Sequence, residues 1–291
     1  MAGRDLVAAA EQKLKGSRFL GIFGGGPNYS EAQDLYQQAA NQFKLSKEWQ
    51  EAASCFEQCA YCAKQQGSAN DEANFYNEAG NVWKKISTAQ AVEQWEKAVA
   101  IYSAAGGFQR SGKLLISIAE LYEAERLPHK ETKEYYKRAA EMFELDDHGK
   151  TSLSKCNLKY AEYAAKDGDL QEAIRLFESE GEKALQSTLL QYGAKDHFLR
   201  AGILHLVVGD PVNIEMALDK YRSLDPRFAD SREGQLLASL AEAYEAKDVD
   251  LFVDKLGDYD AVTKLDAWKT EFLVKVKDQI GGGGPEGPDL S

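Results

Sequence analysis

The chain of 291 residues is acidic, with a formal net charge of −12, and 44% of its residues are hydrophobic. This composition is typical of a folded protein and excludes low-complexity disorder for most of the length. Proteins that bind nucleic acids generally are basic, so the acidic charge argues against a nucleic-acid partner.

Targeting and membrane-spanning segments are not apparent in the sequence. The longest apolar runs, such as residues 201–208, are far shorter than the roughly 20 residues needed to cross a bilayer. Residues 1–20 carry charges throughout, unlike a signal peptide, and position 2 is not the glycine that myristoylation requires. We therefore expect a cytoplasmic protein whose association with membranes is peripheral.

Residues 17–27 form an apolar, glycine-rich segment. Glycine disfavours a buried helix there, and basic residues precede the apolar ones. An apolar tip with basic flanks is typical of a segment that inserts into the membrane interface. The predicted membrane contacts are Phe19, Leu20, Ile22 and Phe23. The alternative is a loop that folds back onto the first helices.

Small and aromatic residues recur along the chain with a period of about 40 residues. In one set an aromatic residue stands three positions after a first residue, which is small in three of the four pairs. The pairs are Ala40 and Phe43, Gly80 and Trp83, Ala119 and Tyr122, and Tyr160 and Tyr163. In a second set it stands four positions later: Ala52 and Phe56, Ala91 and Trp95, Thr132 and Tyr136, Ala173 and Phe177, with Ala217 and Tyr221 as a possible fifth copy.

This spacing predicts two amphipathic helices in each unit. The small residue leaves room for a neighbouring helix, and the aromatic residue fills the space one turn later. Glycine-containing turns separate the segments, for example at Gly67, Gly106 and Gly168. The predicted fold class is all-α, built from antiparallel helix hairpins like tetratricopeptide repeats but lengthened from about 34 residues to about 40.

Three stretches lack acidic residues altogether, namely 107–119, 148–160 and 183–195. They fall near the first helix of successive units, and equivalent positions of stacked repeats lie side by side. The pattern predicts a basic stripe on an otherwise acidic protein, suited to an acidic, elongated partner such as a helical bundle. An ordinary solvated surface is the alternative.

The residues that usually carry chemistry show no catalytic or metal-binding pattern. Cys55, Cys59 and Cys62 are spaced as one face of a helix, and the Cys-x-x-Cys pair lacks the second ligand pair that zinc requires. Buried packing is the favoured interpretation of these thiols and of Cys156. The glycine-rich stretches are not phosphate-binding loops. We predict a binding protein rather than an enzyme, without a cofactor or metal.

Several segments together resemble one family. They are residues 117–123 (SIAELYE), 154–159 (SKCNLK), 189–196 (LLQYGAKD), 225–233 (DPRFADSRE), 265–269 (LDAWK) and 289–291 (DLS). The chain resembles, over essentially its whole length, the soluble N-ethylmaleimide-sensitive factor attachment proteins (SNAPs), closest to the alpha/beta type.

The resemblance implies an elongated twisted sheet of helical hairpins over residues 1–180, a helical bundle over 181–280 and a flexible Gly/Pro tail over 281–291. It also implies an adaptor in vesicle-mediated transport, such as ER–Golgi transport, and in membrane fusion. Family members bind the four-helix bundle of assembled SNARE complexes and recruit the hexameric ATPase, N-ethylmaleimide-sensitive factor (NSF), which unwinds the bundle.

The resemblance also assigns roles to residues. The expected SNARE contacts are Lys113, Lys155, Lys159, Leu189, Lys195 and Arg232, and the expected ATPase-stimulating residues are Asp289 and Leu290. Many members carry arginine where this chain has Phe108, and Arg110 is a candidate substitute. The acidic tail is thinned to Glu286 and Asp289. An acidic cluster, formed by Glu242, Glu245, Asp248 and Asp250, is a second candidate surface for the ATPase, and an ordinary solvated helix face is the equal alternative.

A generic tetratricopeptide-like interaction scaffold, for example a receptor for chaperone tails, is the alternative function. The longer repeat period and the apolar segment 17–27 argue against it. An enzyme with a site hidden between helices is disfavoured because no nucleophile and base stand out.

Overall fold

The computed structural model describes residues 3–15 and 26–282, and these contain fifteen α-helices and one short 3-10 helix, with no strand among them. The prediction of an all-α protein is confirmed. The helices group into two compact units, Met1–Leu153 and Ser154–Ser291.

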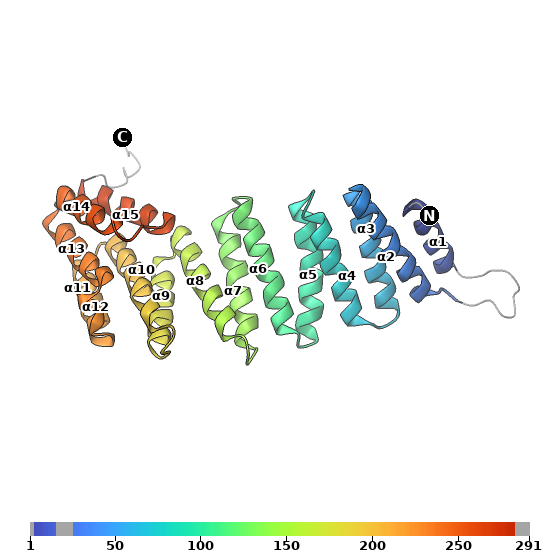
Figure 1. The fold of residues 1–291 in the computed structure, drawn as a ribbon, viewed down its shortest axis with the longest axis horizontal. Helices are drawn as coiled ribbons and strands as arrows, with labels where there is room; N and C mark the ends of the chain where they lie inside the picture. The colour runs from blue at the N-terminus through green and yellow to red at the C-terminus, as the bar shows by residue number, and fades with distance from the viewer. Residues whose placement is uncertain (1–2, 16–25, 283–291) are drawn as a thin grey trace, which may run out of the picture. The chain divides into compact units, whose positions relative to one another are not determined.

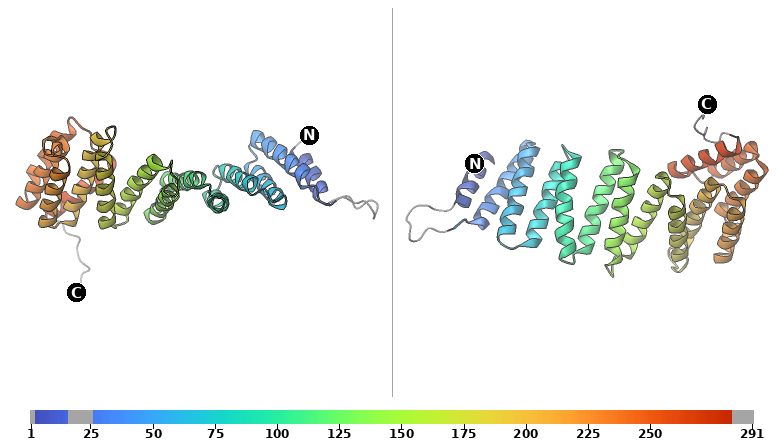
Figure 2. Two further views of the ribbon diagram at one scale, coloured as in Figure 1. Left: turned by 90° about the horizontal axis from the view of Figure 1, so that it is seen from below. Right: turned by 180° about the vertical axis from the view of Figure 1, so that it is seen from behind.

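The first unit is a succession of antiparallel helices. Its elements are α1 (Gly3–Lys15), α2 (Tyr29–Ser46), α3 (Trp49–Gln65), α4 (Ala69–Trp83), α5 (Thr88–Ala104), α6 (Phe108–Ala124) and α7 (His129–Glu144). Each helix packs against the next one along the chain. Figures 1 and 2 show α2 to α7 standing side by side in chain order. The division into units falls within the next helix, α8 (Lys150–Lys166).

The predicted repeat describes this arrangement correctly. The first set of paired residues lies in α2, α4, α6 and α8, and the second set lies in α3, α5, α7, α9 and α11. Ala52, Ala91 and Ala173 are fully buried. The close packing is clearest at Gly80, where an added Cβ would stand 2.5 Å from the ring of buried Trp95. A small residue is therefore required where the aromatic ring of the following helix crosses.

Local signals explain where these helices begin and end. The side chain of Asn28 accepts a hydrogen bond from the amide of Glu31 at the start of α2, and Ser87 does the same for the amide of Gln90 at the start of α5. Gly67 adopts a φ of +74° in the turn after α3, a conformation that favours glycine.

The second unit is a bundle around one central helix. It contains most of α8, then α9 (Leu170–Leu185), η1 (Gln191–Gly193), α10 (Ala194–Val208), α11 (Pro211–Leu224), α12 (Arg227–Asp230), α13 (Arg232–Ala246), α14 (Val249–Asp260) and α15 (Ala267–Ile280). Helix α10 contacts α9, α11, α13 and α15. It is apolar on nearly all sides, which is the pattern of a helix surrounded by others.

Aromatic side chains fill the centre of this bundle. The rings of Phe198 and Tyr221 stack with their centroids 4.8 Å apart, and Phe228 meets both edge-on. The division between the units lies earlier than the boundary expected near Glu180. That residue lies inside α9, and α9 contributes Phe177 and its neighbours to the same core.

The cysteines and the lengths of the helices bear on two further predictions. The four cysteines are free and buried, as the packing interpretation predicted. Burial raises the pKa of Cys55 and Cys62 to about 11. Among the described helices, none is both long enough and apolar enough to cross a membrane.

Candidate partner-binding surface

Helix α6 presents an exposed lysine in its first two turns. The helix starts after Gly107, and Lys113 points away from the buried side formed by Leu114 and Leu115. No acidic side chain of the described residues pairs with Lys113. Its ammonium is therefore available to an outside acidic group.

Arg110, the candidate substitute for a missing basic residue, already has partners inside the first unit. Its Nη1 donates to Oδ1 of Asn70 at 2.6 Å, and its guanidinium lies 4.5 Å from the ring centroid of Tyr102. The side chain remains exposed. The contacts with Asn70 and Tyr102 nevertheless set the orientation of its guanidinium group.

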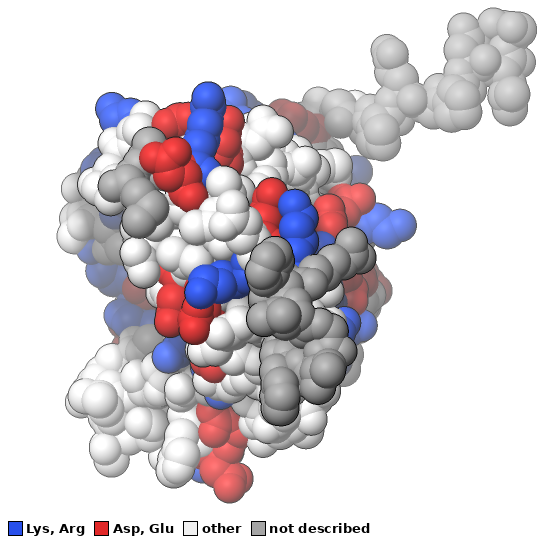
Figure 3. All heavy atoms as spheres, turned by 90° about the vertical axis from the view of Figure 1, so that its right-hand side faces the viewer, with Lys and Arg blue, Asp and Glu red and all other residues white. Residues whose placement is uncertain are grey.

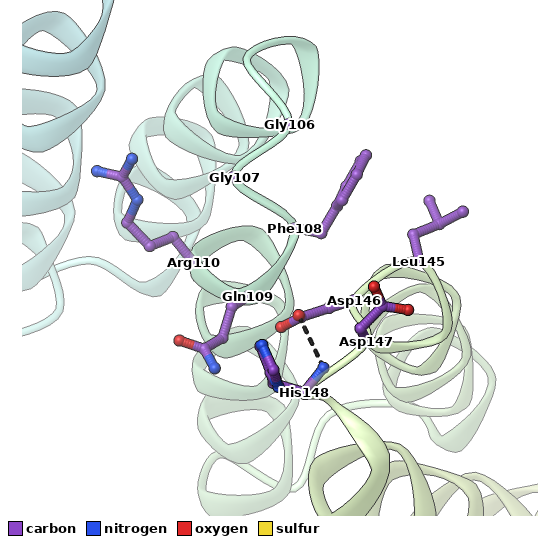
Figure 4. A pocket seen from close by; sticks show the side chains of 9 residues that line it. All are labelled: Gly106, Gly107, Phe108, Gln109, Arg110, Leu145, Asp146, Asp147 and His148. Atoms are coloured by element: carbon purple, nitrogen blue, oxygen red, sulfur yellow. Dashed lines mark hydrogen bonds between the residues drawn. The ribbon is translucent and has the colours of Figure 1, made fainter.

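A surface hollow beside Arg110 is shown in Figure 4. It has a volume of about 450 Å³ and lies between the turn that precedes α6 and the turn that follows α7. Within it, the amide of His148 donates to Oδ1 of Asp146 at 3.1 Å. Arg110 is among the residues that line the hollow, and Figure 4 shows its side chain pointing away from Asp146 and His148.

Helix α8 carries two of the expected contact lysines. Lys155 is exposed and pairs with no acidic residue in the described part of the chain. Lys159, one turn later, is half-buried, and its Nζ lies 3.3 Å from Oε2 of Glu162. The two lysines therefore differ, because the charge of Lys159 is partly balanced within its own helix.

The buried carboxylate of Glu180 connects α9 to the part of α8 that carries these lysines. Glu180 of α9 accepts hydrogen bonds from the Ser154 hydroxyl at 2.6 Å, from Asn157 Nδ2 at 2.9 Å and from Lys183 Nζ at 2.8 Å. Burial opposes ionisation, but these bonds outweigh it and lower the pKa of Glu180. The carboxylate therefore holds α8 against α9 while it is charged.

The third acid-free stretch, 183–195, differs from the other two in its location. The stretches 107–119 and 148–160 begin the helices α6 and α8, as predicted, but 183–195 covers the end of α9, the connection with η1 and the first residues of α10. The reason is that α9 continues to Leu185 before the chain turns. Leu189 lies in this connection and is 84% exposed.

The last two expected contacts lie close together in the second unit. Lys195 in the first turn of α10 has its Nζ 3.0 Å from Oε2 of Glu233 on α13. Arg232, the neighbour of Glu233, donates to the Thr263 hydroxyl at 3.1 Å and to the Tyr259 carbonyl at 3.3 Å. Both cations are thus engaged by the fold, and Arg232 connects α13 to the end of α14.

The surface on the side of α1 has a different character. Figure 3 shows acidic and basic side chains next to one another there, rather than separated by sign. Two ion pairs belong to this region, Arg4 with Glu48 and Lys13 with Glu31. Net attraction of an acidic partner is therefore not expected from this side.

Comparison with known proteins identifies the family. Residues 1–281 match the family described as "Soluble NSF attachment protein, SNAP". The chain is 38% identical to the alpha-soluble NSF attachment protein of Mus musculus, over 95% of this chain and 94% of that protein. The corresponding figures for the alpha-soluble NSF attachment protein of Vitis vinifera are 37%, 99% and 98%. For the probable vesicular-fusion protein sec17 homolog of Schizosaccharomyces pombe they are 32%, 95% and 95%.

The chain belongs to the soluble NSF attachment protein family. The resemblance inferred from the quoted segments is thereby confirmed, and the family match covers both compact units.

Some of the predicted functional residues lie outside the described residues. These are the four apolar residues of segment 17–27, Phe19, Leu20, Ile22 and Phe23, and the two tail residues Asp289 and Leu290. The acidic cluster is described, and its four members are exposed around the turn between α13 and α14. One of them, Asp248, also caps α14 by accepting a hydrogen bond from the amide of Leu251 at 2.9 Å.

Two acidic residues of this SNAP were not anticipated from the sequence. Both Glu180 and Glu233 are buried. Glu233 pairs with the expected contact Lys195, and Glu180 accepts bonds from Ser154 and Asn157, which stand on either side of Lys155 in the sequence. Because Lys195 belongs to α10, no local spacing points to its contact with Glu233. For Glu180, the spacing of three residues to Lys183 on α9 was an available signal, but its bonds to Ser154 and Asn157 of α8 depend on how the two helices pack. Glu233 directly follows Arg232 within a segment that resembled the family.

Proposed function

We propose that this chain is an adaptor that binds assembled SNARE complexes, recruits the ATPase NSF and stimulates it to disassemble them during vesicle fusion and trafficking. The supporting observation is membership of the SNAP family over nearly the full length, together with relatives named as NSF attachment and vesicular-fusion proteins. The adaptor performs no reaction itself, since ATP hydrolysis belongs to its partner.

The proposed SNARE-binding surface consists of Lys113, Lys155, Lys159, Leu189, Lys195 and Arg232. Lys113 and Lys155 are its main electrostatic elements, because both are exposed and neither is balanced by an acidic residue in the described structure. Leu189 adds an exposed apolar side chain. A partner with an acidic, elongated surface meets both requirements, and a SNARE four-helix bundle is such a partner.

The test is a double charge reversal, Lys113→Glu with Lys155→Glu, measured against a soluble SNARE bundle. Exposed ion pairs contribute about 0–1 kcal/mol each, so we expect roughly tenfold weaker binding, with a smaller difference at high salt. The matched control is Lys64→Glu with Lys137→Glu, two exposed lysines on α3 and α7. Equal losses in both double variants, or an affinity independent of salt, would contradict the proposed surface.

Peripheral membrane contact through residues 17–27 is a separate part of the proposal. Replacing Phe19 and Phe23 with serine should reduce co-flotation with liposomes. It should also slow disassembly of membrane-embedded SNARE complexes more than of soluble ones. A fully buried Phe contributes about 1.5–3 kcal/mol, which suits weak, reversible attachment. A large drop in melting temperature would instead place these rings in the protein core.

Stimulation of the ATPase is assigned to Asp289 and Leu290. The variant Leu290→Ala should fold normally and bind the SNARE bundle, but should lower stimulated ATP hydrolysis and disassembly. Unchanged stimulation in this variant would move the proposed coupling site to the acidic cluster around the α13–α14 turn.

A further inference from the structure

The cations of the proposed SNARE-binding surface are not equivalent, and the difference is largest at Lys195. Its Nζ lies 3.0 Å from a carboxylate oxygen of Glu233. The side chain of Glu233 is only 10% exposed, whereas that of Lys195 is 43% exposed. A fixed, buried acidic group thus stands beside a lysine that reaches the surface.

The Glu233 carboxylate has few other partners. Its Oε2 atom is buried and accepts no hydrogen bond from the described residues, so its contact with Lys195 is an ion pair without hydrogen-bond geometry. The Tyr259 hydroxyl donates to Oε1 over 3.5 Å, a long bond. The ammonium of Lys195 is therefore the main compensation for this buried negative charge.

The carboxylate cannot follow Lys195 if the lysine turns toward a partner. Glu233 lies in the first turn of α13, where the Ser231 hydroxyl accepts a hydrogen bond from the Gly234 amide. Its neighbour Arg232 donates hydrogen bonds to the Tyr259 carbonyl in α14 and to the Thr263 hydroxyl just after α14. A helix N-terminus also favours a negative charge at this position. Lys195, in contrast, can reorient on its flexible stem.

We propose that Glu233 is an intramolecular competitor for Lys195 and limits the affinity of the second unit for acidic partners. Seen from outside, the charges of the pair largely cancel, and an incoming carboxylate must draw Lys195 away from Glu233. This inference rests on the proposed function, because it concerns the same acidic SNARE bundle. It adds a residue that weakens, rather than makes, the contact.

The direct test is Glu233→Gln in the full chain, measured against the soluble SNARE bundle at several salt concentrations. Release of Lys195 should tighten binding about three- to tenfold and make it more sensitive to salt. Adding Lys195→Met should abolish the gain. The matched control is Asp230→Asn, which removes the same charge from an exposed site on nearby α12 and should change the affinity less.

A comparison of single lysine variants keeps the test decisive if Glu233→Gln proves poorly folded. Because Lys155 is unpaired and Lys195 is balanced, Lys155→Met should weaken binding several-fold more than Lys195→Met does. Equal losses in these two variants would overturn the proposal. So would an unchanged or weaker affinity in a well-folded Glu233→Gln variant.

The outcomes also separate this inference from the proposed function. If the unmodified chain binds the bundle but Glu233→Gln brings no gain, only the competitor role fails. If the unmodified chain does not bind the bundle at all, the proposed function fails, and the competitor role fails with it.

Discussion

The carboxylate of Glu178 on α9 joins three helices of the second unit, and its removal gives a quantitative prediction. Its Oε1 accepts a hydrogen bond from the Tyr221 hydroxyl at 2.7 Å, and its Oε2 accepts one from Lys220 Nζ at 2.7 Å. Nε2 of His205 lies 3.5 Å from Oε1. Burial alone would raise the pKa of Glu178, but its bonds to His205, Lys220 and Tyr221 outweigh burial and lower the pKa from 4.5 to about 2.

The size of this shift sets the expected loss of stability. A pKa that falls from 4.5 to about 2 on folding corresponds to roughly 3 kcal/mol. Because the pKa is lower in the folded state, this stabilisation is complete above the unfolded value and is lost as the pH falls through the folded value. We expect Glu178→Gln to lower the free energy of unfolding by about 2–3 kcal/mol at pH 7, since Lys220 is partly exposed to solvent.

The assay is urea unfolding followed by circular dichroism, for the unmodified chain and the variant, between pH 7 and pH 2.5. The difference in unfolding free energy should shrink as the pH falls below about 4.5. Glu182→Gln is the control, because Glu182 also pairs with Lys220 but is 42% exposed and should contribute at most about 1 kcal/mol. A difference for Glu178→Gln that stays constant down to pH 2.5 would refute the reasoning.

Three further predictions concern packing, capping and thiols. Gly181→Ala should cost about 1–3 kcal/mol, because the new Cβ would stand 2.6 Å from the buried ring of Phe198. Gly257→Ala is the control, because no atom lies within 4 Å of the added Cβ, and it should be neutral or stabilise by up to about 1 kcal/mol. Similar melting temperatures for Gly181→Ala and Gly257→Ala would contradict the close packing at Gly181. Asp210→Ala should cost about 1 kcal/mol in urea unfolding, because the carboxylate caps α11 by accepting from two backbone amides, and no loss would mean that the cap contributes little. Alkylation by a maleimide in the native state should be slow and should accelerate on unfolding; a fast native reaction would contradict the buried, raised-pKa setting of Cys55, Cys59, Cys62 and Cys156.

The helical repeat was predictable because its determinants are local. Pairs such as Ala91 and Trp95 lie within one helix. Their spacing indicates both the helical period and which face of the helix is buried. The same logic identified the cysteine face of α3. Helix α10 was harder to place, because it is apolar on nearly all sides and its pattern marks no single buried face.

The charges of the candidate surface were predictable only in part. The pairing of Lys159 with Glu162 follows from a spacing of three residues on one helix. The pairing of Lys195 with Glu233 joins α10 to α13, and it depends on how the bundle closes. The engagement of Arg110 by Asn70 similarly joins α6 to α4. Counting basic residues along the sequence therefore overestimates how many of them are free.

This distinction changes how the proposed surface should attract a partner. If the lysines of the surface were equivalent, replacing any one of them would weaken binding by a similar factor. The salt dependence of binding would then reflect their total number. With Lys195 paired with Glu233 and Lys159 partly balanced by Glu162, which Arg200 also contacts, the long-range attraction should come mainly from the unpaired lysines. The balanced lysines can contribute only after contact, when a partner's carboxylate replaces the internal one. On this proposal, electrostatic recruitment belongs to the unpaired lysines and close-range binding to the balanced ones.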